Sequence, residues 1–293
     1  MSISLQKQFG GFFPYFGIQR KAVDAYITEI TNSNLSPEIK AMTIANTKKT
    51  FKEFKNQAAI AEIAMKNAKT GTDFNESSKV DDDWLARFMD AAKFVSNEDM
   101  QFVWGRILAG EFEKPGYTPP QMTRVLSEIT LKYAQIFTTL CSLRSNMLVC
   151  DSRSKLLAQS NKLIINYKDP IFETIQINFK TLSELHNYGL IEFSTMGFID
   201  KLQKEIYPEL FLKYGNDVIK VIDYPDNQFP IGQVLLTDVG ACLANITETQ
   251  TVEGYLESLK TYLTKNNVKL SEKQEIWGID EPIPQPSPST PST

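Results

Sequence analysis

Histidine is nearly absent from the sequence, and this scarcity excludes several kinds of site. His186 is the single histidine among 293 residues. Metal sites built from several histidines are therefore excluded, and a Ser–His–Asp or Cys–His catalytic system would have to use this one residue. No Gly-x-Ser-x-Gly nucleophile turn occurs in the chain. We predict no catalytic role for His186.

Cysteine is also sparse, and long apolar runs are missing. The three cysteines, Cys141, Cys150 and Cys242, lie among apolar residues. An odd, sparse set does not form a disulfide framework, so we expect buried thiols in a reducing compartment. No run of 18 apolar residues predicts a transmembrane helix, and the first residues do not resemble a secretory signal. These features predict a cytoplasmic protein.

Motifs for phosphate binding and acid–base chemistry are missing as well. The sequence contains neither Gly-x-x-x-x-Gly-Lys-Ser/Thr nor Gly-x-Gly-x-x-Gly. Asp81, Asp82 and Asp83 fit the capped start of a helix better than a metal site, because three consecutive side chains point in different directions. Glu111 and Glu113 form a pair without a recognisable apolar pocket. We predict no cofactor, no metal and no catalytic residue; an enzyme with an unrecognised site is the alternative.

Charge is unevenly distributed along the chain. Residues 1–70 hold 10 Lys/Arg against 5 Asp/Glu, a net charge of +5, whereas residues 166–247 hold 6 against 11, a net charge of −5. An anionic partner is therefore expected at the N-terminal end, and nucleic acid is not expected at the acidic C-terminal part.

The N-terminal part predicts a long helical arm. An aromatic loop at residues 9–17 precedes a helix over residues 18–31, and Ser36 and Pro37 begin a second helix that extends to Lys69. Apolar residues recur along the second helix in steps of three and four, as on a seam for another long helix: Phe51, Phe54, Ala58, Ala61, Met65 and Ala68. Residues 1–70 therefore form an arm, followed by a linker over residues 71–80.

The middle of the chain predicts a helical bundle over residues 81–145. Asp81 caps the first helix, Ser96 begins a capping box before the second, and Gly110 ends the second. Two further helices follow Thr118 and Thr130. Their apolar positions recur at helical spacing, with Trp84 and Trp104 on inward faces.

The pattern changes after residue 145 to a mixture of helices and strands. One helix is expected from Pro170 to Gly189 with five inward residues: Ile171, Ile175, Phe179, Leu182 and Leu185. Short β-like runs lie at residues 163–165, 190–193, 218–222 and 233–236, and helices at 237–246 and 252–265. Residues 266–293 end in a Pro/Ser/Thr-rich stretch that predicts a disordered tail. The fold class is mainly α (α+β), with a small β-sheet in the module over residues 146–265.

Two groups of residues are candidates for an interaction surface. Phe12, Phe13 and Phe16 put rings on the aromatic loop, and Lys48, Lys52 and Lys55 form one stripe of the long helix. The rings pack on the protein's own core or on a partner or lipid interface. The lysines form a solvated face or contact phosphate or lipid headgroups. Self-association or a protein partner through residues 1–70 is the leading expectation.

Several motifs resemble a known family. They include Asn56-Gln57, Asp82-Asp83-Trp84, Met100-Gln101-x-x-Trp104 and Leu108-Ala109-Gly110-Glu111. This set is similar to the bacterial family of domains of unknown function numbered twenty-eight-oh-six, over roughly residues 45–245. The resemblance implies a fold and a bacterial origin, and no activity.

A looser resemblance concerns Tyr188-Gly189-Leu190-Ile191 and Leu236-Thr237-Asp238-Val239-Gly240. These two segments are similar to parts of the alpha-type abortive-infection proteins of phage exclusion and to the winged-helix module of small regulators. They imply a winged-helix-like module. The leading function is a non-enzymatic interaction protein in phage defence, and the alternative is a winged-helix DNA-binding regulator.

Overall fold

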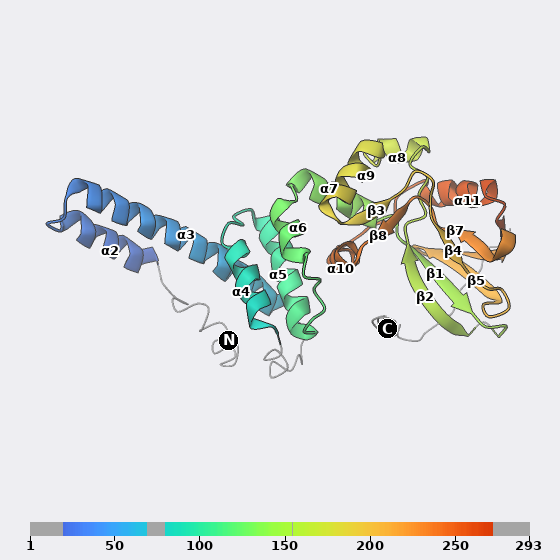
Figure 1. Cartoon of the computed structure of the whole chain (residues 1–293), viewed down its shortest axis with the longest axis horizontal. Helices are drawn as coiled ribbons and strands as arrows, with labels where there is room; N and C mark the ends of the chain where they lie inside the picture. Colours follow the sequence, from blue (N-terminus) through green and yellow to red (C-terminus); the bar gives the residue numbers. More distant parts are fainter. Residues whose placement is uncertain (1–19, 69–79, 154, 272–293) are drawn as a thin grey trace. The chain divides into compact units, whose positions relative to one another are not determined.

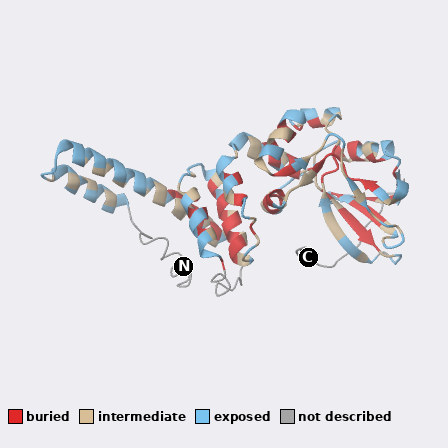
Figure 2. Cartoon of the chain, viewed as in Figure 1, coloured by how far each residue is buried: buried red, intermediate tan, exposed pale blue. Residues whose placement is uncertain are grey.

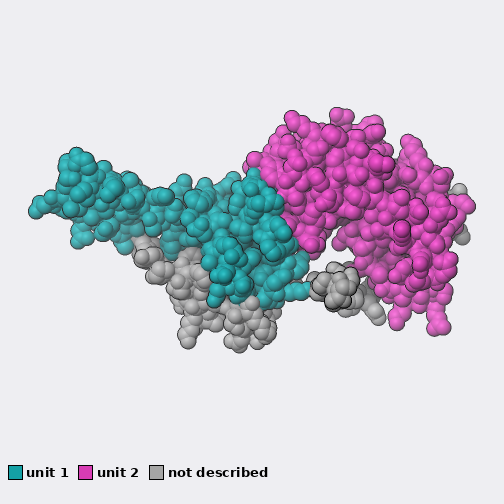
Figure 3. All heavy atoms as spheres, in the orientation of Figure 1, with its two compact units in different colours: residues 1–129 teal, residues 130–293 magenta. Residues whose placement is uncertain are grey.

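The computed structural model describes residues 20–68, 80–153 and 155–271. It divides the chain into two compact units, residues 1–129 and 130–293 (Figure 3). The aromatic loop at 9–17 and the stretch after residue 271 lie outside the described residues, as does the linker apart from Val80. The division at residue 129 differs from the one expected after residue 145, because the helix over residues 131–141 belongs to the second unit.

Unit 1 begins with a helical hairpin. Helix α2 (Arg20–Asn32) is followed by α3 (Pro37–Asn67), which runs back along it (Figure 1). Ser36 caps α3 by accepting from the backbone N–H of Ile39, and Pro37 fills the first position, as the sequence predicts. Burial changes along α3: no residue of α2 is buried, and the first buried residue of α3 is Asn56 (Figure 2).

The rest of unit 1 is a small bundle around the second half of α3. Its helices are α4 (Asp82–Ala92), α5 (Glu98–Glu113) and α6 (Met122–Glu128). Trp104 is fully buried, with its ring centroid 4.8 Å from that of Phe88. Gly105 allows α3 and α5 to approach closely, because a Cβ at this position would lie 2.4 Å from Cγ2 of Ile63. Helix α5 therefore packs against α3, so the part of the expected arm from Asn56 onward contributes to the core.

Two details of α5 differ from the sequence prediction. Its cap is Asn97, whose side chain accepts from the backbone N–H of Met100, and not Ser96. The helix also continues three residues beyond Gly110, to Glu113. The carbonyl of Gly110 accepts from the N–H of Lys114, so this glycine lies within the last turn and does not end the helix.

Unit 2 contains an antiparallel sheet of five strands in the order β2-β1-β5-β6-β9. The strands are β1 (Ser145–Cys150), β2 (Leu156–Lys162), β5 (Glu209–Tyr214), β6 (Asp217–Asp223) and β9 (Lys269–Leu270). Strand β9 falls within the stretch that the sequence predicts as a tail. Strands β1, β2 and β5 have no counterpart in the sequence-based prediction. The mainly α (α+β) fold class with a small sheet is confirmed.

A second group of elements in unit 2 surrounds two short paired strands. Helix α7 (Leu131–Cys141) packs against α9 (Phe179–Tyr188), and β3 (Ile191–Phe193) pairs with β8 (Val234–Leu236). Leu163 bridges Val234 on the other edge of β8. Helices α8 (Pro170–Thr174), α10 (Asp238–Ile246) and α11 (Tyr255–Lys265) complete the unit, with strands β4 (Ile199–Lys201) and β7 (Gln228–Pro230).

The two segments Tyr188–Ile191 and Leu236–Gly240 meet in this group. Thr237 caps α10 and also donates its hydroxyl to the carbonyl of Gly189, 2.7 Å away. A Cβ on Gly240 would collide with the carbonyl oxygen of Leu190, so only glycine fits there. The Leu-Thr-x-x-Gly motif therefore docks α10 against the turn that ends α9.

The single helix expected from Pro170 to Gly189 is instead two helices. The chain breaks between α8 and α9 at Gln176, whose φ of 62° is left-handed and incompatible with a continuous helix. Asn178 then caps α9 with a capping box. The break turns Phe179 outward, so it is 55% exposed, in contrast to the inward position expected. Gly189 ends α9 in a left-handed conformation, as predicted.

Candidate interaction surface

The outer half of the α2–α3 hairpin is the least covered helical part of unit 1. From Pro37 to Lys55, α3 has no buried residue, and neither has α2. Large apolar side chains remain exposed around the turn between the two helices: Tyr26, Leu35, Ile39 and Met42. These exposed apolar side chains make the outer half of the hairpin a candidate contact surface.

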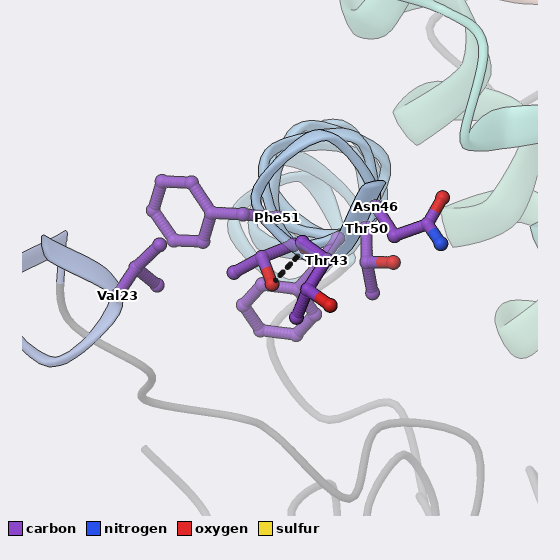
Figure 4. A pocket seen from close by; sticks show the side chains of 7 residues that line it. Val23, Thr43, Asn46, Thr50 and Phe51 are labelled. Carbon is purple, nitrogen blue, oxygen red and sulfur yellow. Dashed lines mark hydrogen bonds between the residues drawn. The ribbon is translucent and has the colours of Figure 1, made fainter. Parts of the chain in front are cut away.

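A groove lies between α2 and α3 in this outer half. Its volume is about 340 Å³. Val23 of α2 lines one side, and the ring of Phe51 projects toward it from α3 (Figure 4). The remaining lining residues come from α3: Thr43, Asn46, Thr47, Thr50 and Phe54. The Thr47 hydroxyl donates to the carbonyl of Thr43, 2.8 Å away, so this hydroxyl is satisfied within its own helix and its methyl group is left for the groove.

Among the described residues that line the groove, none has a charged or titratable side chain. Neutral apolar and hydroxyl groups provide neither an acid–base pair nor a nucleophile with an activating base. The described lining therefore suits contact with an apolar side chain.

The lysine stripe predicted as a candidate lies beside the groove and not in it. Lys48, Lys52 and Lys55 are all exposed. Lys48 and Lys55 directly follow the groove residues Thr47 and Phe54, so each lies roughly 100° further around the helix. Phe12, Phe13 and Phe16 lie outside the described residues. The sequence did not indicate the groove threonines Thr43, Thr47 and Thr50, because polar residues repeated along a helix are typical of its solvent-exposed face.

The polar residues of the family-like motifs join α3 to the ends of its neighbours. The Asn56 side-chain amide donates to the carbonyl of Lys93 at 2.8 Å, and Gln57 donates to the carbonyl of Met89 at 2.7 Å. Gln101 donates to the carbonyl of Val95 at 2.8 Å. These amides satisfy backbone carbonyls at and beyond the end of α4, which would otherwise be left without partners.

Glu111 has a similar structural task. It is 2% exposed, and its carboxylate accepts from the backbone N–H groups of Gly116 and Thr118 at 2.6 and 2.8 Å. One carboxylate thus holds the loop after α5 in place. This explains the acidic residue of the Leu-Ala-Gly-Glu motif without a catalytic role.

A known protein family matches the part of the chain that contains these motif residues. The model described as "Protein of unknown function (DUF2806)" matches residues 44–260, well over half of the sequence. The chain belongs to the DUF2806 family. No curated protein and no solved structure is significantly similar to it.

The DUF2806 match begins within α3. Val23 and Thr43 of the groove therefore precede the matched residues, whereas Asn56, Gln101 and Glu111 lie within them. The family match thus includes the bundle core and the groove residues of α3 from Asn46 to Phe54, but not α2. The looser resemblance to abortive-infection proteins stays a prediction.

The remaining candidates for chemistry have structural partners. Asp81 caps α4 by accepting from the N–H of Trp84 at 2.6 Å. The Nδ1 atom of His186 lies 3.0 Å from the carbonyl of Ile191, at the turn between α9 and β3. Among residues 20–68, 80–153 and 155–271, no cluster of three His, Cys, Asp or Glu residues has metal-binding geometry.

The cysteines agree with the sequence-based expectation of buried thiols. All three thiols are buried and unpaired, and burial raises the pKa of Cys141 to about 12 and that of Cys150 to about 11. Such thiols are poor nucleophiles at neutral pH. None of the described helices combines the length and the apolar character needed to cross a bilayer.

Proposed function

We propose that this DUF2806 protein is a non-enzymatic interaction protein whose α2–α3 hairpin binds an apolar helix of a protein partner. The observation that carries the proposal is the groove between Val23 and Phe51, which lies in a hairpin half without a single buried residue.

The energetics of a two-helix hairpin support this function. Isolated helices of about 12–15 residues are marginal in water, and most helical stability in proteins comes from packing an apolar face. Helix α2 has 13 residues, and its apolar residues Val23, Ile27 and Ile30 are only half-buried against α3. A third helix laid in the groove would complete this packing, in the manner of helix-in-groove recognition.

Charge indicates what kind of helix would fit. Residues 20–55 hold 7 Lys/Arg against 4 Asp/Glu, a net charge of +3. The exposed lysine stripe lies next to the groove. A partner helix with an apolar stripe and acidic flanks would match both features, whereas a second copy of the same positive hairpin would match only the apolar one.

The placement of the motif residues supports a function without catalysis. The amides of Asn56, Gln57 and Gln101 and the carboxylate of Glu111 are used in hydrogen bonds that hold backbone groups. A catalytic group needs an atom free to meet a substrate. These motif residues are therefore better explained by architecture.

Photo-cross-linking in cells that produce the protein tests the proposal. A benzophenone amino acid is placed either at Thr50, which is exposed and lines the groove, or at Ala45, which is also exposed but lies roughly 140° away around α3. We expect a discrete adduct with one protein from position 50 and none from position 45. An adduct of twice the chain mass would identify a second copy as the partner. Equal or absent adducts at the two positions would contradict the proposal.

The second candidate function is DNA binding by a winged-helix-like module in unit 2. The order of α7, α8, α9, β3, β8 and α10, with Leu163 bridging β8, favours this alternative. Strands β4 to β7 would then be an insertion in the wing. The helix in the recognition position, α9, carries Lys180 and also Glu184, and so presents no basic stripe.

We therefore expect no sequence-specific duplex binding by the full chain. Fluorescence anisotropy with a randomised duplex pool at physiological salt measures this directly. Nanomolar, sequence-dependent binding that is lost in Lys180→Glu would favour the regulator instead. A role in phage defence also stays a prediction. Comparing plaque counts on cells that produce the native protein with those on cells that produce Thr50→Asp would test it.

A further inference from the structure

Unit 2 carries an exposed cluster of three aromatic rings. Tyr167, Phe179 and Phe193 come from three separate segments: the loop after β2, the start of α9 and the end of β3. Their ring centroids lie 5.5 Å apart for Tyr167–Phe193, 5.7 Å for Phe179–Phe193 and 6.1 Å for Tyr167–Phe179. Each ring thus contacts both others, and we call the three the aromatic cluster.

The aromatic cluster is open to solvent. Phe179 is 55% exposed, and Tyr167 and Phe193 are half-buried. Two exposed lysines adjoin it: Lys180 follows Phe179, and the Nζ atom of Lys168 lies 5.9 Å from the Tyr167 ring centroid. Aromatic rings with lysines at their edge are suited to a proline-rich, acidic peptide, because prolines pack on aromatic surfaces and carboxylates pair with the lysines.

We propose that residues 280–291 of the same chain bind the aromatic cluster. This stretch reads Asp-Glu-Pro-Ile-Pro-Gln-Pro-Ser-Pro-Ser-Thr-Pro. Closely spaced prolines favour the polyproline II conformation, which repeats every three residues. Pro282, Pro288 and Pro291 are separated by multiples of three, so they share one face. That face presents prolines to the rings.

The charges agree with this assignment. Asp280 and Glu281 directly precede Pro282. Asp280 and Glu281 begin the segment. When the proline face lies on the rings, these two carboxylates come within reach of Lys168 or Lys180.

The chain is long enough to reach the cluster from where the described part of unit 2 ends. Ser271 is held at the sheet, where its N–H donates to the carbonyl of Lys220 at 2.9 Å. Pro282 lies eleven positions after Ser271, and at about 3.1 Å per position this stretch spans up to roughly 34 Å. The further residues to Pro291 extend the reach to roughly 60 Å. A compact unit of this size is roughly 40 Å across, so the contact can form within one chain.

Photo-cross-linking in the purified full chain tests the proposal. A benzophenone amino acid replaces Gln285, which lies in the same three-residue register as Pro282 and Pro288. After irradiation, mass spectrometry should locate intrachain cross-links at Tyr167, Phe179 or Phe193. Cross-links elsewhere, cross-links only between chains, or no cross-links would each overturn the proposal.

Matched variants identify the contact. Pro288→Ala with Pro291→Ala should lower the cross-link yield roughly tenfold, which corresponds to the loss of about 1.4 kcal/mol of binding free energy. Pro284→Ala with Pro286→Ala, which lie off that face, should leave the yield unchanged. Phe179→Ala should also lower the yield, whereas Phe102→Ala, an equivalent change at an exposed ring of unit 1, should not. Equal losses in both proline pairs would contradict a specific face. The outcome does not depend on the hairpin groove.

Discussion

Trp104 is the largest of the fully buried side chains among the described residues. It is fully buried, and its ring contacts Phe88, which in turn stacks on Trp84 at 4.9 Å. Trp104→Ala should lower the free energy of unfolding by about 3–5 kcal/mol, because the cavity cannot be refilled by its neighbours. Urea denaturation followed by circular dichroism measures the change. Trp84→Ala changes a half-buried side chain and should lower the free energy of unfolding by less. Equal decreases for the two variants would contradict the larger contribution of Trp104.

Residue roles that depend on local sequence were predictable. Ser36, Asp81 and Thr237 cap their helices as expected, since a short polar side chain directly before an apolar repeat is typical of a helix N-cap. Phe179 was not predictable. Its exposure follows from the left-handed Gln176, and a non-glycine residue in that conformation carries no sequence signal.

Two glycines of α5 give a matched pair at the scale of the helix. A Cβ on Gly105 would lie 2.4 Å from Ile63 of α3, whereas the nearest atom to a Cβ on Gly110 is 3.9 Å away, on Tyr117. Gly105→Ala should therefore destabilise the protein by about 1–3 kcal/mol through overpacking. Gly110→Ala should be neutral or stabilising by up to about 1 kcal/mol, because alanine favours helix. Thermal unfolding of both variants checks the difference; a neutral Gly105→Ala would mean that α3 and α5 are further apart.

An ion-pair cluster joins β6, β9 and the loop before β5. The Asp223 carboxylate lies 2.6 Å from Lys204 Nζ and 3.4 Å from Lys269 Nζ. The hydrogen bond from Lys204, with that from Lys269, lowers the pKa of Asp223 below its usual value. The native state thus favours the carboxylate, so its stabilisation is present above the unfolded pKa of about 4 and is lost as the pH falls through the native pKa. Asp223→Asn should lower the urea midpoint at pH 6 and change it less at pH 3. An equal loss at both pH values would exclude the carboxylate as the cause.

Helices were easier to predict from the sequence than strands, for a physical reason. The helical elements of unit 1 show their apolar period within their own residues. Strand β1 depends on distant partners instead: Met147 pairs with Ser160 and with Leu212. Strand β2 is mostly polar, and only its pairing with β1 makes it a strand. The groove of the hairpin was equally hidden, because it needs Val23 of one helix and Phe51 of another.

At the scale of the whole molecule, the change in burial along α3 separates the candidate interaction surface from the core. Residues up to Lys55 are exposed or half-buried, whereas Ile60, Ala61 and Ala64 are at most 1% exposed and belong to the bundle. The arm expected over residues 1–70 therefore includes core residues in its last third.

Two truncations at different points along α3 test this division. A chain of residues 56–293 keeps Asn56 and the residues that pack on α5, so it should retain cooperative unfolding while no longer co-purifying with the partner that cross-linking at position 50 of the full chain identifies. A chain of residues 71–293 lacks the helix that covers Gly105, so α4 and α5 should lose protection. Hydrogen exchange with mass spectrometry on peptides from α4 and α5 measures this, and peptides from β5 and β6 in unit 2 serve as the control. If both truncated chains protect α5 equally, α3 does not contribute to the core. If residues 56–293 co-purify with that partner as well as the full chain does, the partner does not bind the outer hairpin, since the shorter chain has lost Val23 and Phe51 and with them the groove.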